Sequence, residues 1–273
     1  MNPQFLMDGL IAGAIIGLGA VGVTLTYSIL RFSNFAHGEL LSWGAYLALG
    51  ISSALGVVGA GFTTPLGPFS FGWSLPIAAV LAIVLTGLLA LAVDAALFSS
   101  FRRRGSAIII MVMASFGASL ALRSLLEFLF TSKPAYFSQA LHLVMTRTDI
   151  GRAMRAVSEN PGLAGIAGID VRRVIRTAWF LGAALACIAG IMSGLIIQIR
   201  PYLGHDLLLP LFAAAILGGI GSVPGAMIAG LFIGLSEAFT VQLSGAELRA
   251  AVSFAILIAC LLVRPRGLFG KAT

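Results

Sequence analysis

The sequence predicts an all-α protein, a polytopic bundle of transmembrane helices with about eight spans in one domain over residues 1–273. Hydrophobic residues make up 59% of the chain and charged residues only 10%, whereas soluble domains carry roughly a quarter charged residues. The mean hydropathy is +1.04. The apolar residues also gather in stretches near the roughly 20 residues that a helix needs to cross a bilayer.

The charge of the chain predicts its topology. There are 17 Lys and Arg against 10 Asp and Glu, and the basic residues lie in a few short runs. Lys and Arg concentrate in the cytoplasmic loops of membrane proteins. No basic face with interleaved aromatic residues indicates nucleic-acid binding. Cys187 and Cys260 lie in apolar stretches without metal-ligand spacing, so we expect neither a metal nor a cofactor site.

Four spans are predicted in the first half, at about 10–30, 40–58, 75–98 and 108–130. A stripe of small residues on the first span favours close packing against another helix of the same chain. That stripe consists of Gly9, Gly13 and Gly17.

Charged residues at the ends of these spans suggest two ion pairs. Asp94 can pair with the arginines at 102–104, which place that end of the third span in the cytoplasm and the amino terminus outside. Arg123 and Glu127 are four residues apart on the fourth span, so we expect an ion pair on one helix face.

The segment between the first two spans carries the most polar cluster, formed by Asn34, His37 and Glu39. Ionisable groups at membrane depth are functional candidates, which makes these residues candidates for a transport pathway. The structural alternative is a short polar turn at the membrane interface, which costs little free energy.

Four further spans are predicted at about 178–199, 207–220, 226–241 and 248–263. The glycine-dense stretch 218–225 lacks the lysine and Ser/Thr of a phosphate-binding P-loop, so it indicates a tight turn or broken-helix packing. Gly230 and Gly234 repeat the small-residue spacing of the first span.

The stretch 147–176 contains six arginines between apolar spans, which predicts a cytoplasmic loop. A short helix over 151–157 is broken at Asn160-Pro161-Gly162, and Asp170 can cap a helix that begins at Val171. The loop either only sets topology, or its small apolar residues dock into a groove on a soluble partner.

Four motifs resemble one family. GRAMRAVSENPGLAGIAGIDVRRV (151–174) resembles the cytoplasmic coupling loop of the permease subunits of branched-chain amino acid ABC importers. The same family is matched by YSILRFSNFAHGELLSWGAYLA (27–48), AILGGIGSVPGAMIAGLFIGLSEA (215–238) and RPRGLFG (264–270). The motifs cover most of the chain in the expected order, and the chain looks most like the shorter of the two paired permeases.

The resemblance also exposes a departure. Both arginine-rich segments, 102–104 and 147–176, favour the cytoplasm, so an even number of crossings must separate them. Only 108–130 is long enough to cross, because 133–146 has too few residues and contains a proline. The family has a further helix here, so we expect one helix to be missing near 131–146; the alternatives are a re-entrant 108–130 segment and a genuine loss of the helix.

The resemblance implies a non-catalytic permease subunit, multi-pass in a bacterial inner membrane, that carries branched-chain or related amino acids. Its implied partners are a second permease subunit in a heterodimer, cytoplasmic ATP-binding subunits, a periplasmic substrate-binding protein and the lipid bilayer. A permease for urea or short-chain amides is an alternative, because related permeases share these motifs. An autonomous channel or ion-coupled carrier is disfavoured, because most charged residues lie at span ends.

In the loop, the resemblance suggests that residues 156–167 dock into a groove on the ATPase subunit. The candidate coupling residues are Arg152, Arg155, Ala156, Glu159, Asn160, Pro161, Gly165 and Gly168. The chain has no nucleotide-binding motif of its own, so ATP hydrolysis on the ATPase subunit would supply the energy for transport. Movement of this loop would transmit that energy to the helices.

Overall fold

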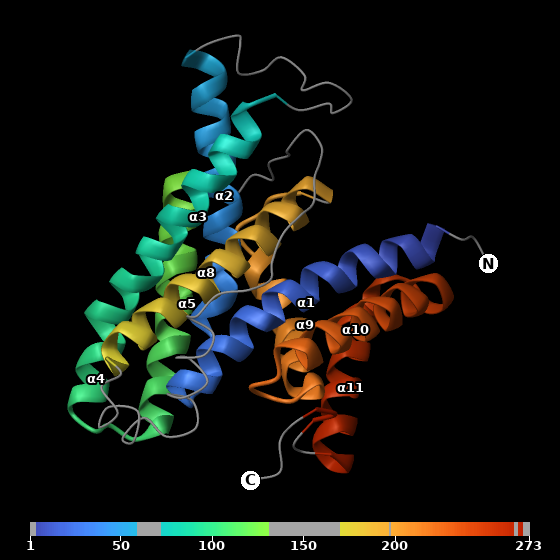
Figure 1. Cartoon of the computed structure of the whole chain (residues 1–273). Helices are drawn as coiled ribbons and strands as arrows, with labels where there is room; N and C mark the ends of the chain where they lie inside the picture. Colours follow the sequence, from blue (N-terminus) through green and yellow to red (C-terminus); the bar gives the residue numbers. More distant parts are fainter. Residues whose placement is uncertain (1–3, 59–71, 131–169, 197, 265–266, 270–273) are drawn as a thin grey trace.

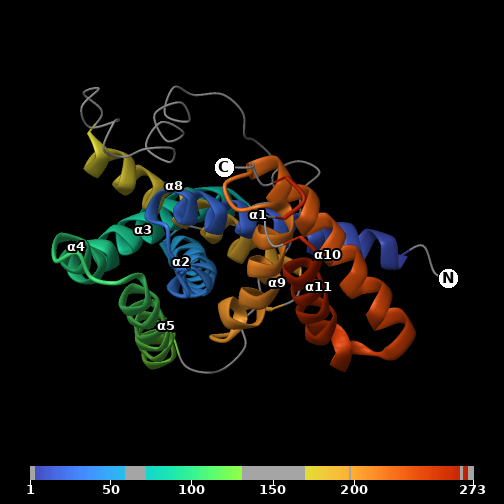
Figure 2. The same ribbon diagram turned by 90° about the horizontal axis from the view of Figure 1, so that it is seen from below.

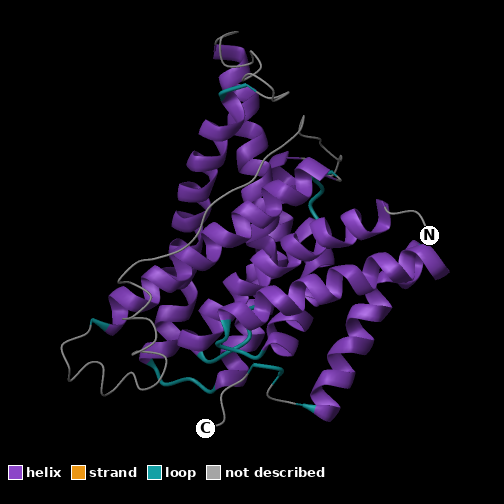
Figure 3. Ribbon diagram, turned by 45° about the vertical axis from the view of Figure 1, so that its right-hand side comes forward, coloured by secondary structure: helices purple, strands orange, loops and turns teal. Residues whose placement is uncertain are grey.

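The computed structural model describes residues 4–58, 72–130, 170–196, 198–264 and 267–269. Every named element is a helix, as Figures 1 and 3 show. In chain order these are α1 (Gln4–Leu30), α2 (Ala36–Val58), α3 (Ser74–Val93), the π-helix η2 (Asp94–Phe98), α4 (Ser99–Arg103), α5 (Ile108–Phe130), α8 (Val171–Ile196), α9 (Leu203–Gly218), α10 (Val223–Ser244), the 3-10 helix η3 (Ala246–Leu248) and α11 (Arg249–Val263).

Among the described residues, seven helical stretches are long and apolar enough to cross a membrane. α3, η2 and α4 count as one of these stretches, from Ser74 to Arg103, and η3 with α11 counts as another. α9 is a shorter apolar helix of 16 residues. With α9 included, the described helices correspond to the eight predicted spans, and the prediction of a polytopic helical bundle is confirmed.

α2 lies at the centre of the bundle and contacts α3, α5, α8 and α9. Figure 2 shows α2 nearly end-on, with these helices arranged around it. Three buried aromatic rings pack against one another where η2 meets α8. The ring centroid of Phe98 lies 5.2 Å from that of Phe32 and 5.3 Å from that of Trp179. These rings join the α1–α2 connection, η2 and α8.

Glycines allow α1 and α10 to approach each other closely. A Cβ atom on Gly230 would lie 2.3 Å from Cα of Gly17, and one on Gly234 would lie 2.2 Å from the backbone nitrogen of Gly13. Neither position can therefore carry a side chain without separating the helices. The predicted packing of the α1 stripe within the chain is confirmed.

The arginine-rich helix ends lie on one side of the bundle. Figure 1 shows α4, the first turns of α8 and the end of α11 in the lower part of the view, and the end of α2 at the top. Arginines lie near these lower ends, at 102–104, 172–173, 176 and 264. The preference of arginine for cytoplasmic loops predicts that this side faces the cytoplasm. The predicted ion pair there is confirmed, because Arg102 donates to both carboxylate oxygens of Asp94 at 2.6 and 2.8 Å.

The turn between α9 and α10 is tight and is joined by the end of the chain. Gly219 and Gly221 have φ of 91° and 93°, a region that glycine enters without strain. Ser222 caps α10, because its Oγ accepts a hydrogen bond from the backbone of Gly225 at 3.2 Å. The backbone nitrogen of Leu268 donates to the carbonyl of Leu217 at 2.7 Å. The predicted tight turn is confirmed, and two of the family motifs meet at it.

Candidate functional site

The three polar residues predicted as one cluster at the start of α2 point to different places. The Asn34 side chain accepts a hydrogen bond from the backbone of Ala36 at 3.2 Å and so caps α2. His37 is buried and faces α1 and α8, where a Cβ atom on Gly22 would lie 2.8 Å from its Nε2. Glu39 faces α5. The cluster is therefore not a single site.

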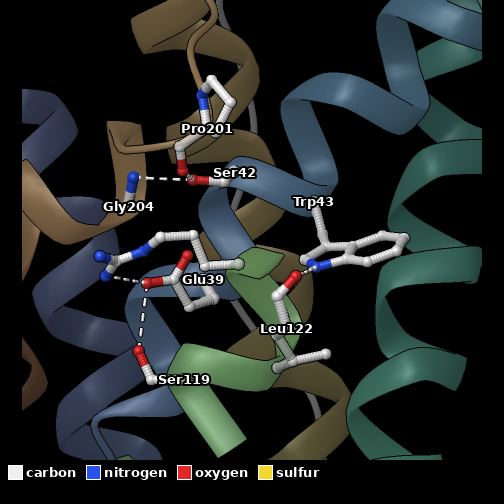
Figure 4. Close-up of polar contacts among 8 residues, drawn as sticks. Glu39, Ser42, Trp43, Ser119, Leu122, Pro201 and Gly204 are labelled. Carbon is white, nitrogen blue, oxygen red and sulfur yellow. Dashed lines mark hydrogen bonds and ion pairs between the residues drawn. The ribbon is translucent and has the colours of Figure 1, made fainter. Parts of the chain in front are cut away.

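Glu39 forms a buried ion pair with Arg123 across α2 and α5. The Arg123 guanidinium donates to Glu39 Oε1 at 2.8 Å, and the side chains are 12% and 0% exposed respectively. Ser119, one turn earlier on α5, donates to the same oxygen at 3.1 Å. Figure 4 shows this arrangement. A charge in this environment is stabilised mainly by its partner, because water is excluded.

The predicted ion pair between Arg123 and Glu127 is wrong, because the guanidinium turns to Glu39 instead. It also lies over the Tyr202 ring, 5.0 Å from the ring centroid, which adds a cation–π contact. Glu127 Oε1 is buried and has no hydrogen-bond partner, and the same is true of the Tyr46 hydroxyl oxygen. Arg123 therefore links α2, α5 and the segment before α9, and does not form a local pair on one helix.

Neighbouring residues of α2 fix its position against α9 and α5 (Figure 4). The Ser42 hydroxyl donates to the carbonyl of Pro201 at 3.2 Å and accepts from the backbone nitrogen of Gly204 at 2.8 Å. The Trp43 indole donates to the carbonyl of Leu122 at 3.0 Å. These contacts join α2 to α5 and to the start of α9 next to the Glu39–Arg123 pair.

Another buried carboxylate lies in the last part of α10, toward Ser244. Glu237 is 1% exposed and accepts from Arg249 Nε at 2.7 Å and from the Ser253 hydroxyl at 2.5 Å. Residues 237 and 249 lie on different helices, twelve positions apart across a turn, so no local spacing rule predicts this pair. An isolated glutamate inside an apolar span was the only signal in the sequence.

Most of the predicted coupling loop lies outside the described residues. This holds for all eight candidate coupling residues and for the stretch 131–146. The described end of the loop is consistent with the prediction, because Asp170 Oδ1 accepts from the backbone nitrogens of Arg172 and Arg173 at 3.0 and 3.1 Å. Asp170 therefore caps α8, as predicted.

The chain matches the family model described as "Branched-chain amino acid transport system / permease component" over residues 5–135 and 135–261. The high-affinity branched-chain amino acid transport system permease protein LivH of Escherichia coli K12 is 33% identical over 308 residues, with 99% of this chain and 98% of that protein covered. BraD, the corresponding permease of Pseudomonas aeruginosa, is 30% identical over 296 residues, covering 98% and 95%. A probable LivH of Methanocaldococcus jannaschii is 31% identical over 296 residues, covering 99% and 93%.

These matches bear on the helix expected to be missing. The alignment with the E. coli protein spans 308 positions, whereas this chain has 273 residues, so at least 35 positions face no residue here. The match to the family is divided at residue 135. The unmatched positions outnumber the roughly 20 residues of one span, and the division of the family match at residue 135 falls within the stretch 131–146 where a span is expected to be missing.

Proposed function

The chain belongs to the family of branched-chain amino acid transport permeases, and we propose that it carries branched-chain or related amino acids through the inner membrane, driven by ATP hydrolysis on a separate subunit. The observation that carries the proposal is the match to this family on both sides of residue 135, together with full-length relatives named for these substrates. The chain is a multi-pass permease component of an ABC importer.

The family implies ATPase and binding-protein partners. We further infer that this chain pairs with a second permease subunit and has no catalytic activity of its own. Many large apolar side chains on the described helices are exposed, among them Phe128 at 84% and Leu262 at 78%. Such surface is suited to lipid or to a neighbouring transmembrane subunit.

Two other functions are less well supported. A permease for urea or short-chain amides is not favoured, because the full-length relatives are named for branched-chain amino acids. An ion-coupled carrier is expected to bind its ion with charged groups in broken helices at mid-membrane. Here the buried Glu39 and Glu237 are both engaged by arginines.

Coupling to the ATPase is assigned to the loop between residues 147 and 176. Arginines at 172, 173 and 176 continue from this loop into the first turns of α8, on the same side as Arg102–104. α8 in turn contacts α1, α2 and α3. A displacement of the loop by an ATPase subunit would therefore reach the centre of the bundle through α8.

The test is uptake of radiolabelled leucine by proteoliposomes that contain this chain, the second permease, the ATPase subunits and the binding protein. Gly165→Trp and Glu159→Lys are the coupling variants. We expect both to insert and to abolish most uptake while ATP hydrolysis continues, because the docking surface is altered and the helices are not.

The matched control is Glu247→Lys, which makes the same charge change on an exposed residue at the opposite side of the bundle. It should retain uptake. Normal uptake and normal substrate-stimulated hydrolysis in both loop variants would reject the coupling assignment. An absence of leucine uptake by the unaltered transporter would reject the proposed substrate.

A further inference from the structure

A cavity of about 300 Å³ lies between α1, α8, α9, α10 and α11. Its apolar wall includes Ile11 and Ile15 of α1 and Ile196 of α8. Its charged wall is formed by Asp8, Glu237 and Arg249. Ligand pockets of small molecules begin at about this volume and combine an apolar lining with a few placed polar groups.

The charged groups of the cavity come in both signs. Glu237 is buried and is held by Arg249 Nε and by Ser253, whereas the Arg249 side chain is 39% exposed. A guanidinium has five N–H donors and matches carboxylates with two parallel hydrogen bonds. Asp8 is exposed and adds a second carboxylate. The wall therefore offers guanidinium N–H donors for an anion and the exposed carboxylate of Asp8 for a cation.

The cavity lies at the outer side of the bundle. α8 and α11 have their arginine-rich ends on the cytoplasmic side, so Ile196 and Arg249, at their other ends, lie toward the outside. α10 ends at Ser244, close in sequence to Arg249, and the beginning of α1 packs along it. Figure 1 shows the beginning of α1 and the end of α10 next to each other, at the right of the view.

We propose that this cavity receives a zwitterionic amino acid with an apolar side chain as it enters the transporter. Arg249 binds the carboxylate while Glu237 holds its guanidinium in place, Asp8 binds the ammonium group, and Ile11, Ile15 and Ile196 contact the side chain. The inference rests on the proposed function and extends it by naming residues that the substrate touches.

Other occupants fit the wall less well. An acyl chain needs no charged groups, and burying charges next to it costs free energy. A phosphate-bearing ligand would be repelled by two carboxylates facing one arginine. A zwitterion uses groups of both signs and the apolar surface together.

The experiment is leucine uptake by the complete transporter in proteoliposomes, with saturating binding protein. The variants are Arg249→Gln, Glu237→Gln, the double variant Glu237→Gln/Arg249→Gln, Asp8→Asn and Ile11→Trp. Each lost hydrogen bond to a charged group should lower kcat/KM about 10- to 100-fold. Ile11→Trp should lower uptake similarly by filling the cavity without changing the ion pair.

The double variant separates binding from structure. If the Glu237–Arg249 pair only stabilises the fold, removing both charges restores uptake, because neither charge stays buried alone. If the pair binds substrate, the double variant remains as defective as the single variants. Glu247→Gln on η3 is the control, since it removes an exposed charge that does not line the cavity, and it should transport normally.

The two proposals fail in distinguishable ways. If the unaltered transporter carries leucine but the double variant or both Asp8→Asn and Ile11→Trp do so normally, the site is overturned and the proposed function stands. Asp8→Asn and Ile11→Trp decide the matter even if Arg249→Gln does not assemble, because neither touches the ion pair. If the unaltered transporter carries no leucine while hydrolysing ATP, the proposed function is overturned and the amino-acid site with it.

Discussion

Replacing one member of the Glu39–Arg123 pair should destabilise the protein more than replacing both. Glu39→Gln leaves a guanidinium that is only 12% exposed without its counter-charge. Arg123→Gln leaves a fully buried carboxylate that is held by Ser119 at 3.1 Å. In each case a charge remains in a place that water does not reach.

The magnitude follows from the burial of the pair. Removing one partner of a buried ion pair costs about 3–5 kcal/mol, whereas removing both costs much less. Because the Tyr202 ring lies 5.0 Å from the guanidinium, Glu39→Gln should lie near the lower limit. For the double variant Glu39→Gln/Arg123→Gln we expect a loss of about 2 kcal/mol, below that of either single variant, which implies a coupling energy of at least about 4 kcal/mol.

The assay is equilibrium unfolding by SDS in mixed micelles, followed by tryptophan fluorescence and applied to the four members of the double-mutant cycle. Asp94→Asn serves as a comparison, because its partner Arg102 is 24% exposed and keeps some contact with water. Asp94→Asn should lower the free energy of unfolding by about 1 kcal/mol. If the losses of the two single variants add to within about 0.5 kcal/mol of the double variant, the charges do not interact and the reasoning is refuted.

Three further predictions concern packing and backbone geometry. Gly230→Ala should cost about 1–3 kcal/mol, because its Cβ would lie 2.3 Å from the α1 backbone, whereas Gly117→Ala, with nothing within 4 Å, should be neutral or stabilising in the same SDS titration. Trp43→Phe should cost about 0.5–1.5 kcal/mol by removing the donor to a buried α5 carbonyl, while Trp73→Phe at a 54% exposed position should have no measurable effect on the thermal midpoint. Gly267→Ala should release the chain end from the α9–α10 turn and speed its digestion by carboxypeptidase, since φ is 74° and a Cβ would lie 2.4 Å from a carbonyl of α9; an unchanged digestion rate would contradict this contact.

The helices could be predicted closely wherever an apolar run has sharp ends. α5 begins at the predicted residue, 108, because Gly105 and Ser106 precede its apolar run. α8 begins at Val171, seven residues before the predicted span at 178. The predicted span counts only apolar residues, so it leaves out the arginine-rich first turns of the helix. The Asp170 cap predicted the start of the helix itself correctly.

The site residues were less predictable, for two physical reasons. His37 and Glu39 are two residues apart, so on a helix of 3.6 residues per turn they point to nearly opposite sides. This spacing could have separated the predicted cluster once α2 was known to begin at Ala36. The partner of Arg123 could not be found in this way, because the pairing depends on α2 and α5 lying side by side, and local spacing favoured Glu127.

The glycine contact between α1 and α10 has a consequence for how the protein is made. α1 leaves the ribosome before α10, and Gly230 and Gly234 follow about 200 residues later. At roughly 5–20 residues per second, this interval lasts about 10–40 s. During it, the smooth face of α1 must lie against lipid or an insertion factor. α1 therefore reaches its final position only after α10 has been made, and a chain that stops before α10 leaves that face of α1 open to the quality-control machinery.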